Sequence, residues 1–393
     1  MGKLLSNPFF VYIIGFSVVI LVYSLGWSDL YPDLSWPLFT FFIITFIISF
    51  AFGLIFHILK RIEYRDISWD DRISFYLFLV WIGYLAEFIY NKGIPLQILL
   101  SGQDFDYTAF GIPTFHVFLV TYSSFLSVFI FHQLCSKFSK GRFIYFLLSI
   151  LPSILIVSRG TLLIVLTSCL FVYLLSLKHV SPKRVIIILF SAIFVFYLFG
   201  VMGNLRQNNG KNASSALILE IALATEKFRR SVVPDEFIWS YLYISSPLAN
   251  LQNTILVAPD DNINWISFLN YELLPDFISK RTGSFFDLPK SDMPRVAPWL
   301  TVSTLYARAF VFVGWPGMIV LFLFFITTSS LYLMLLRKRS QFYVVGLAIL
   351  NTLVLFNTFD NMYMFSGLNL QLVYPLVLCY VNFPKFILRT RQA

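Results

Sequence analysis

The sequence predicts an all-α, polytopic membrane protein, and three observations support this prediction. Of the 393 residues, 58% are hydrophobic and only 12% are charged, whereas a soluble domain carries about 25% charged residues. The mean hydropathy is +0.77. The apolar residues fall into runs that approach or reach the roughly 20 residues of a spanning helix, and Lys and Arg gather in alternate segments between those runs.

Ten apolar runs are expected to form the membrane-spanning helices. They cover 8–26, 36–59, 73–90, 112–134, 143–158, 160–177, 184–203, 314–336, 342–358 and 368–384. A single helix over 143–177 would be about 52 Å long at 1.5 Å per residue, whereas the hydrocarbon core is about 30 Å thick. We therefore expect this stretch to fold back at Ser158-Arg159-Gly160.

The distribution of Lys and Arg predicts the orientation of these spans, because short cytoplasmic loops retain positive charge. With the N-terminus in the cytoplasm, the basic segments all fall on the inner side: 60–72, 137–142, 178–184, 337–339 and 385–391. The short segments on the outer side carry little more than Lys92 and Arg159. Ten spans with both termini in the cytoplasm satisfy this pattern.

The chain order predicts three parts. Residues 1–203 hold seven spans, 204–297 form one large, polar outer loop, and 298–393 hold a re-entrant or interfacial helix at 298–312 followed by three spans. Acidic and basic residues nearly balance in the loop, which argues against a nucleic-acid partner. We expect short helices near 213–230 and 235–246, and a helix start within Tyr243–Leu251, where Ser precedes Pro.

Arginines at the ends of spans and in the loop are the first candidates for a binding site. An unpaired charge at the bilayer centre costs about 2.5–3.5 kcal/mol, so a charge near the end of a span indicates a functional or structural role. A guanidinium makes two charge-assisted hydrogen bonds to phosphate oxygens, which suits a diphosphate at the membrane surface. The alternative is that these side chains reach for water or pair with acids. The candidates are Arg159, Arg206, Arg308, Arg295, Arg229, Arg230 and Arg281.

Three further residues are candidates for acid–base work or substrate contact. Glu87, near the outer end of the third run, could act as a general base, and an ion pair is an equally good interpretation. His116 could also act as a base, although a histidine satisfied at a helix end is the simpler interpretation. Tyr243 belongs to a group of loop aromatics that suit sugar rings and equally suit ordinary packing.

Motifs for metal, nucleotide or redox chemistry are missing from the sequence. The four histidines are scattered, and there is no HExxH, P-loop or dinucleotide-binding glycine pattern. The three cysteines lie in or beside apolar runs, without the spacing of a zinc site or a disulfide framework. The sequence therefore predicts no metal and no cofactor.

Seven short motifs follow one another between Glu87 and Gly317. They are EFIYNKGIP from Glu87 to Pro95, YTAFGIP from Tyr107 to Pro113, LIVSRGT from Leu155 to Thr161, GNLR from Gly203 to Arg206, YISSPLAN from Tyr243 to Asn250, LYAR from Leu305 to Arg308 and GWPG from Gly314 to Gly317. These motifs resemble those of the oligosaccharide repeat-unit polymerases of the O-antigen (Wzy) type. Their order along the chain and the large outer loop strengthen the resemblance.

The resemblance implies a metal-independent glycosyltransferase of the GT-C class in the bacterial inner membrane, with the large loop in the periplasm. Undecaprenyl-diphosphate-linked oligosaccharides would be donor and acceptor, and the product would be O-antigen or a capsular polysaccharide. A chain-length regulator protein is a further partner that the resemblance suggests. Arg159 and Arg206, with Arg308, would stabilise the departing diphosphate.

The sequence leaves the proton acceptor and two alternative functions open. The proton acceptor could be Glu87, Asp235, Glu236 or Glu272. The related O-antigen ligases have a histidine ahead of a GxxG-like turn, whereas this chain has Ser303 and Thr304 there. A flippase or transporter for lipid-linked oligosaccharides is another alternative, but transporters often show internal repeats and mid-membrane charges, and this chain shows neither.

Overall fold

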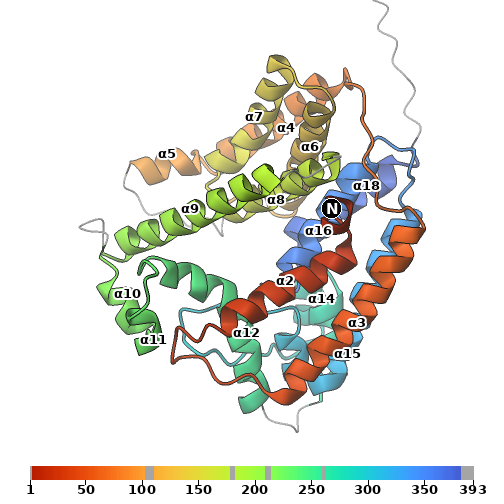
Figure 1. Cartoon of the computed structure of the whole chain (residues 1–393). Coiled ribbons are helices and arrows are strands. Elements are labelled where there is room, and N and C mark those ends of the chain that lie inside the picture. The colour runs from red at the N-terminus through yellow and green to blue at the C-terminus, as the bar shows by residue number, and fades with distance from the viewer. Residues whose placement is uncertain (1, 102–109, 178–181, 209–213, 259–262, 382–393) are drawn as a thin grey trace, which may run out of the picture. The chain divides into compact units, whose positions relative to one another are not determined.

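The computed structural model describes residues 2–101, 110–177, 182–208, 214–258 and 263–381, and the described residues form helices and connecting segments without a named strand. Some predictions fall outside these residues: part of the motif at Tyr107–Pro113, parts of the loop 204–297, the end of the last apolar run and the C-terminal basic segment. The all-α prediction is confirmed for the described residues (Figure 1).

Helices cover nine of the ten predicted runs as continuous or nearly continuous elements. They are α2 (Pro8–Tyr23), α3 (Trp36–Ile58), α4 (Ile73–Tyr90), α6 (Phe115–Ser136), α7 (Lys140–Leu155), α8 (Arg159–Ser176), α9 (Pro182–Gln207), α15 (Ala307–Leu335) and α16 (Tyr343–Phe356). The tenth run is divided into α17 (Ser366–Asn369), η2 (Leu370–Leu372) and α18 (Val373–Leu378). The predicted break at Ser158-Arg159-Gly160 is confirmed, because α7 ends before it and α8 begins within it.

Five of the described helices are long and apolar enough to cross a membrane, namely α3, α4, α6, α8 and α15. The helices α2, α16 and the segment Ser366–Leu378 are shorter and also apolar. Large apolar side chains on α3 are exposed, and Ile47 is 65% exposed. Since such a surface is unfavourable in water and favourable in lipid, these helices have the character of a helical membrane protein.

The chain divides into two compact units. Unit 1 comprises Met1–Glu63, Tyr173–Ser329 and Leu350–Asn369, and unit 2 comprises Tyr64–Val172, Ser330–Ile349 and Leu370–Ala393. The large polar loop predicted at 204–297 therefore lies entirely within unit 1, in the same compact unit as α2 and α3.

In unit 1, α2 packs against α3 and against α12 (Phe237–Val257). The buried Tyr12 hydroxyl on α2 is hydrogen-bonded to Thr45 Oγ1 at 3.1 Å and to the Tyr306 hydroxyl at 2.7 Å, so polar groups among apolar helices are paired. α12 also packs on α9, where Trp239 Nε1 donates to Asn204 Oδ1 at 2.7 Å. The bond from Trp239 to Asn204 fixes α12, in the polar loop, to the end of α9.

The structure corrects the helix start predicted within Tyr243–Leu251. This stretch lies in the middle of α12, and Pro247 is inside the helix. Residues Ser245–Gln252 are buried, so packing against neighbouring helices offsets the backbone hydrogen bond that proline removes. Of the short helices expected near 213–230, the described residues form α10 (Ala216–Ile221) and α11 (Glu226–Arg229).

The segment 298–312, for which a helix is expected, is not helical in its first half. The Asn250 amide explains this, because its Nδ2 donates to Leu300 O at 2.8 Å and to Val302 O at 2.7 Å. Helix α15 begins only at Ala307 and is interrupted at Val313 and Gly314. Gly314 has φ 62° and ψ −148°, a conformation that is essentially restricted to glycine, so the kink in α15 lies at the first residue of the GWPG motif.

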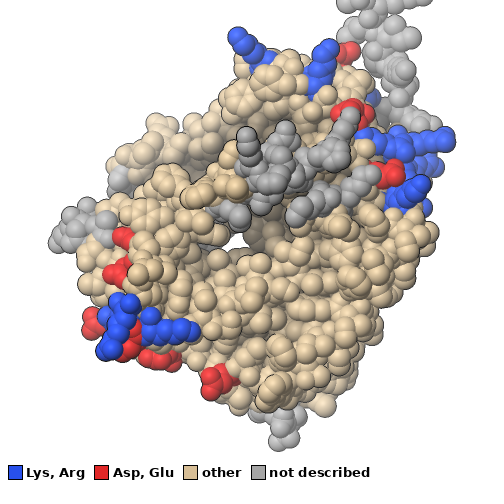
Figure 2. Space-filling model, in the orientation of Figure 1, with Lys and Arg blue, Asp and Glu red and all other residues tan. Residues whose placement is uncertain are grey.

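The surface of unit 1 separates charged from apolar regions. Charged side chains gather over α10 and α11, whereas the surface over α3 carries none in this view (Figure 2).

Beyond α12, the chain continues through α13 (Trp265–Phe268), η1 (Leu269–Leu273) and α14 (Asp276–Phe285) before it reaches α15.

In unit 2, α6 and α7 form an antiparallel hairpin (Figure 1). Ser127 Oγ donates to Ser149 O at 3.0 Å in its middle. At one end, the Arg142 guanidinium lies 5.2 Å from the centroid of the Trp69 ring. The opposite end holds the start of α6 and the connection from α7 to α8, where Arg159 lies. The remaining short helices of the first hundred residues are α1 (Gly2–Leu5) and α5 (Pro95–Leu100).

Candidate functional site

Arg159 and Arg206 lie at the ends of apolar helices and are exposed. Arg159 is the first residue of α8 in unit 2, and Arg206 is the penultimate residue of α9 in unit 1. Neither makes an ion pair with a carboxylate in the described part of the chain. Within the described residues, no carboxylate competes for either guanidinium group.

Arg308, by contrast, is held by two carboxylates of unit 1. Its Nε lies 3.5 Å from Glu272 Oε1, and its Nη2 pairs with Asp360 Oδ1. The Glu272 side chain is fully buried, while Arg308 and Asp360 are 38% and 47% exposed. Asn361 Nδ2 donates to Glu272 Oε2 at 3.0 Å. These contacts join η1 and the start of α15 to the segment that follows α16.

The environment of Glu272 favours its protonated form. Burial raises the pKa of Glu272 from 4.5 to about 7, and Asp360 adds to the increase, while Arg308 and the Asn361 hydrogen bond oppose it. A carboxyl group that binds and releases protons near neutral pH can serve in proton transfer. Because this side chain has no exposed surface, however, the geometry first assigns it the role of holding Arg308.

Glu87 and His116 form a pair in unit 2 that joins α4 to α6. His116 Nδ1 lies 2.9 Å from Glu87 Oε2 and 3.1 Å from Oε1. The Glu87 side chain is fully buried, whereas that of His116 is 28% exposed. The backbone N–H of Ile112 donates to Glu87 Oε1 at 3.3 Å. The structure therefore places in direct contact two residues that are separate candidates in the sequence.

The turn before α6 is shaped around the His116 ring. Gly111 has φ 103°, and a Cβ atom at this position would lie 2.4 Å from His116 Cγ. Thr114 also has a positive φ of 71°, an uncommon conformation for a residue with a side chain. The Phe110 ring packs edge-on against the imidazole, with centroids 5.6 Å apart. Backbone strain of this kind often accompanies functional sites.

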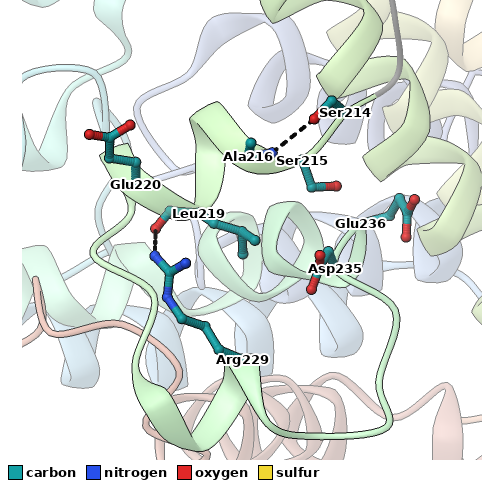
Figure 3. Close-up of a pocket in the computed structure, with 8 residues that line it drawn as sticks. All are labelled: Ser214, Ser215, Ala216, Leu219, Glu220, Arg229, Asp235 and Glu236. Atoms are coloured by element: carbon teal, nitrogen blue, oxygen red, sulfur yellow. Dashed lines mark hydrogen bonds between the residues drawn. The ribbon is translucent and has the colours of Figure 1, made fainter.

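A cavity of about 590 Å³ in unit 1 brings together three of the loop residues considered from the sequence. Arg229, Asp235 and Glu236 line it, together with residues that sequence reasoning did not select: Ser214, Ser215, Ala216, Leu219 and Glu220 (Figure 3). Arg229 is tied to the cavity wall, because its Nε donates to Ala224 O at 2.9 Å and its Nη2 to Leu219 O at 3.1 Å.

The floor of this cavity is a compact apolar core. Leu219 belongs to a buried cluster that includes Phe228 on α11 and Tyr241 on α12. The segment is also tied to the connection between α2 and α3, where Ser28 Oγ donates to Ala222 O at 2.6 Å. The residues that line the polar cavity are therefore held in place by a packed apolar core.

The other predicted contact residues lie on the surface of unit 1. Arg230 pairs with Glu226 at 2.8 Å in a highly exposed ion pair, which contributes little to stability. Arg281 is exposed on α14, and Arg295 is exposed in the segment before α15. Tyr243 is 44% exposed and contacts Phe199 edge-on, with ring centroids 5.0 Å apart.

Sequence reasoning missed Asp360 and Asn361, which complete the environment of Glu272 and Arg308. The signal in the sequence is only a polar pair that closely follows the apolar run 342–358. Among the described residues, no group of three or more His, Cys, Asp or Glu could hold a metal ion.

Comparisons of this chain with protein-family models, with curated proteins and with solved structures found no match.

Proposed function

We propose that this protein is a bacterial inner-membrane polymerase that joins lipid-diphosphate-linked oligosaccharide repeat units into a surface polysaccharide. In this proposal the ten apolar runs span the membrane, both termini are cytoplasmic, and residues 204–297 face the periplasm. The fold belongs to the GT-C class of glycosyltransferases. Support comes from the motif resemblance, from the apolar helices and from the position of two arginines.

The observation that carries the proposal is the exposure of Arg159 and Arg206. Each is exposed at the end of an apolar helix, and neither has a carboxylate partner among the described residues. The diphosphate of a lipid carrier lies just above the hydrocarbon, at the depth where such side chains lie. Guanidinium groups would stabilise the negative charge that develops on it as it leaves.

Arg308 takes a different role, because Glu272 and Asp360 already surround it. These two contacts hold the guanidinium within unit 1, so they are more suited to fixing the segment around α15. Arg159 and Arg206 are therefore each proposed as a contact for the diphosphate, and Arg308 acts by keeping that segment in place.

The cavity lined by Asp235 and Glu236 is assigned to sugars of a lipid-linked glycan. Its volume of about 590 Å³ lies within the usual range for ligand pockets of about 300–1,000 Å³. Carboxylates accept hydrogen bonds from neighbouring hydroxyl groups, and charge-assisted bonds are the stronger ones. The exposed Tyr243 ring offers a flat surface of the kind on which sugars pack.

The reaction is a glycosyl transfer between two lipid-linked chains. A sugar hydroxyl of the new unit forms a bond to the anomeric carbon of the growing chain, and the bond from that carbon to the carrier diphosphate breaks. The electron pair leaves with the diphosphate, and the hydroxyl proton passes to a base. Stabilising the leaving group more strongly in the transition state than in the ground state accelerates the reaction.

The test is the length distribution of the surface polysaccharide in cells that carry Arg159→Ala or Arg206→Ala. Each variant should lose the ladder of long polymers at unchanged protein level. Lys140→Ala is the matched control, since it removes an exposed cation at the opposite end of the α6–α7 hairpin and should leave the ladder intact. Normal ladders in both arginine variants would remove the proposed diphosphate contacts.

A further inference from the structure

The exposures of the four carboxylate candidates and of His116 restrict which group can take the proton from the attacking hydroxyl. Glu87 and Glu272 have no exposed side-chain surface, so neither can touch a substrate in this structure. Asp235 and Glu236 line a cavity in unit 1, whereas His116 belongs to unit 2 together with Arg159. The His116 ring is 28% exposed and is held by a buried carboxylate, and imidazole is the side chain most often used as a general base.

We propose that His116 Nε2 is the proton acceptor of the polymerase reaction and that Glu87 is the residue that positions it. This inference rests on the proposed function and adds to it the identity of the base. No other residue in the described part of the chain donates to or accepts from His116 Nε2, whereas Nδ1 is committed to Glu87.

The geometry sets the state of the imidazole ring. Because a carboxylate only accepts hydrogen bonds, the neutral ring places its proton on Nδ1, facing Glu87. The lone pair then resides on Nε2, the nitrogen that a substrate can approach. Once Nε2 has taken a proton, the buried Glu87 charge stabilises the imidazolium ion. A carboxylate performs this orienting and stabilising role for the histidine of the serine-protease triad.

The structure also places this pair at the same end of the α6–α7 hairpin as Arg159. The antiparallel register is fixed in the middle by the bond from Ser127 Oγ to Ser149 O and by the contact between Phe131 and Phe146. His116 lies about three turns from Ser127 toward the start of α6, and Arg159 follows the end of α7. The proposed base, His116, and the proposed diphosphate-binding cation, Arg159, therefore lie at the same end of the α6–α7 hairpin in unit 2.

The proton follows a balanced path. As the acceptor oxygen bonds to the anomeric carbon, its proton moves to His116 Nε2, and the bond to the carrier diphosphate breaks with both electrons staying on the diphosphate. The imidazolium then releases the proton to water or to the departing diphosphate. The ring returns to its neutral state for the next unit, and no oxidant, metal or cofactor enters the balance.

The experiment measures turnover by the purified full-length protein in nanodiscs, with lipid-linked repeat units extracted from a strain that lacks the gene. His116→Gln should lower turnover by about 10²–10⁴-fold, the usual contribution of general acid–base catalysis. Glu87→Gln keeps a hydrogen-bonding amide but loses the charge, and should lower turnover with little change in KM. His132→Gln is the matched control on the same helix, where Nε2 lies 2.9 Å from Arg65 O, and should retain turnover.

A purely structural pair would behave differently. Imidazole added to His116→Ala should restore part of the turnover if the side chain is the base. Wild-type turnover by His116→Gln, or the absence of rescue in a His116→Ala protein that melts at the wild-type temperature, would overturn the assignment. If Arg159→Ala and Arg206→Ala nevertheless lose polymerisation, the proposed function stands without this base. If neither they nor the His116 variants change it, the proposed function falls as well.

Discussion

At the scale of single residues, Glu272 links the stability of unit 1 to pH. Its carboxyl group is fully buried beside Arg308 and Asn361. Burial moves the pKa of Glu272 upward from 4.5 to about 7, so the folded state binds more protons than the unfolded state between these two values. The free energy of unfolding therefore falls as pH rises through this window, and the loss is complete above about pH 7.

Glu272→Gln should remove this pH dependence, because a glutamine carries no titrating proton. The contribution amounts to at most about 3 kcal/mol, since one pKa unit corresponds to about 1.4 kcal/mol. The measurement compares melting temperatures of the detergent-purified wild type and variant between pH 5 and pH 8. Relative to the variant, the wild type should lose stability as pH rises. Two curves that stay parallel would contradict the pKa shift.

The sequence identified most of the residues in these clusters but not their partners. The sequence predicts a diphosphate contact for Arg308, whereas the structure pairs it with Glu272 and Asp360, which lie 36 and 52 residues away in the chain. Likewise, the sequence offers Glu87 and His116 as separate candidate bases, and the structure shows that they form one pair. Such pairings depend on how helices pack, and residue types in a single sequence do not contain that information.

At the scale of elements, the turn before α6 decides where the His116 ring points. Gly111→Ala places a Cβ atom 2.4 Å from His116 Cγ, at a φ of 103°, so either the ring or the turn must move. Turnover should then fall as it does in His116→Gln. Gly141→Ala is the matched control, because no atom lies within 4 Å of the added Cβ. Turnover of both variants is measured in the nanodisc assay, and equal turnover would show that the turn does not position the ring.

The apolar runs predicted the helices well, because a helix satisfies every backbone group within itself and suits a lipid environment. Helix boundaries set by side-chain bonds were not predictable in the same way. Asn250 binds the carbonyl groups of Leu300 and Val302, which replaces the helix expected at 298–312. Pro247 suggested a helix start, but packing keeps it inside α12.

At the scale of the whole molecule, the composition and the described helices establish an all-α chain with helices of membrane-spanning length. The span count, the orientation and the assignment of 204–297 to the periplasm remain predictions from the positions of Lys and Arg. Polymerisation at the periplasmic face requires that orientation, because the loop cavity and the arginine ends must meet the lipid-linked substrates on one side.

The central claim is that this protein joins repeat units, and deletion of its gene tests that claim most directly. The measurement is the electrophoretic pattern of the surface polysaccharide in the deletion strain, with and without a plasmid that carries the wild-type gene. We predict a single repeat unit on the lipid core in the deletion strain and a restored ladder with the plasmid. Long polymer without the gene, or a lipid core that carries no unit at all, would contradict the claim, and the second result would indicate a flippase or a ligase.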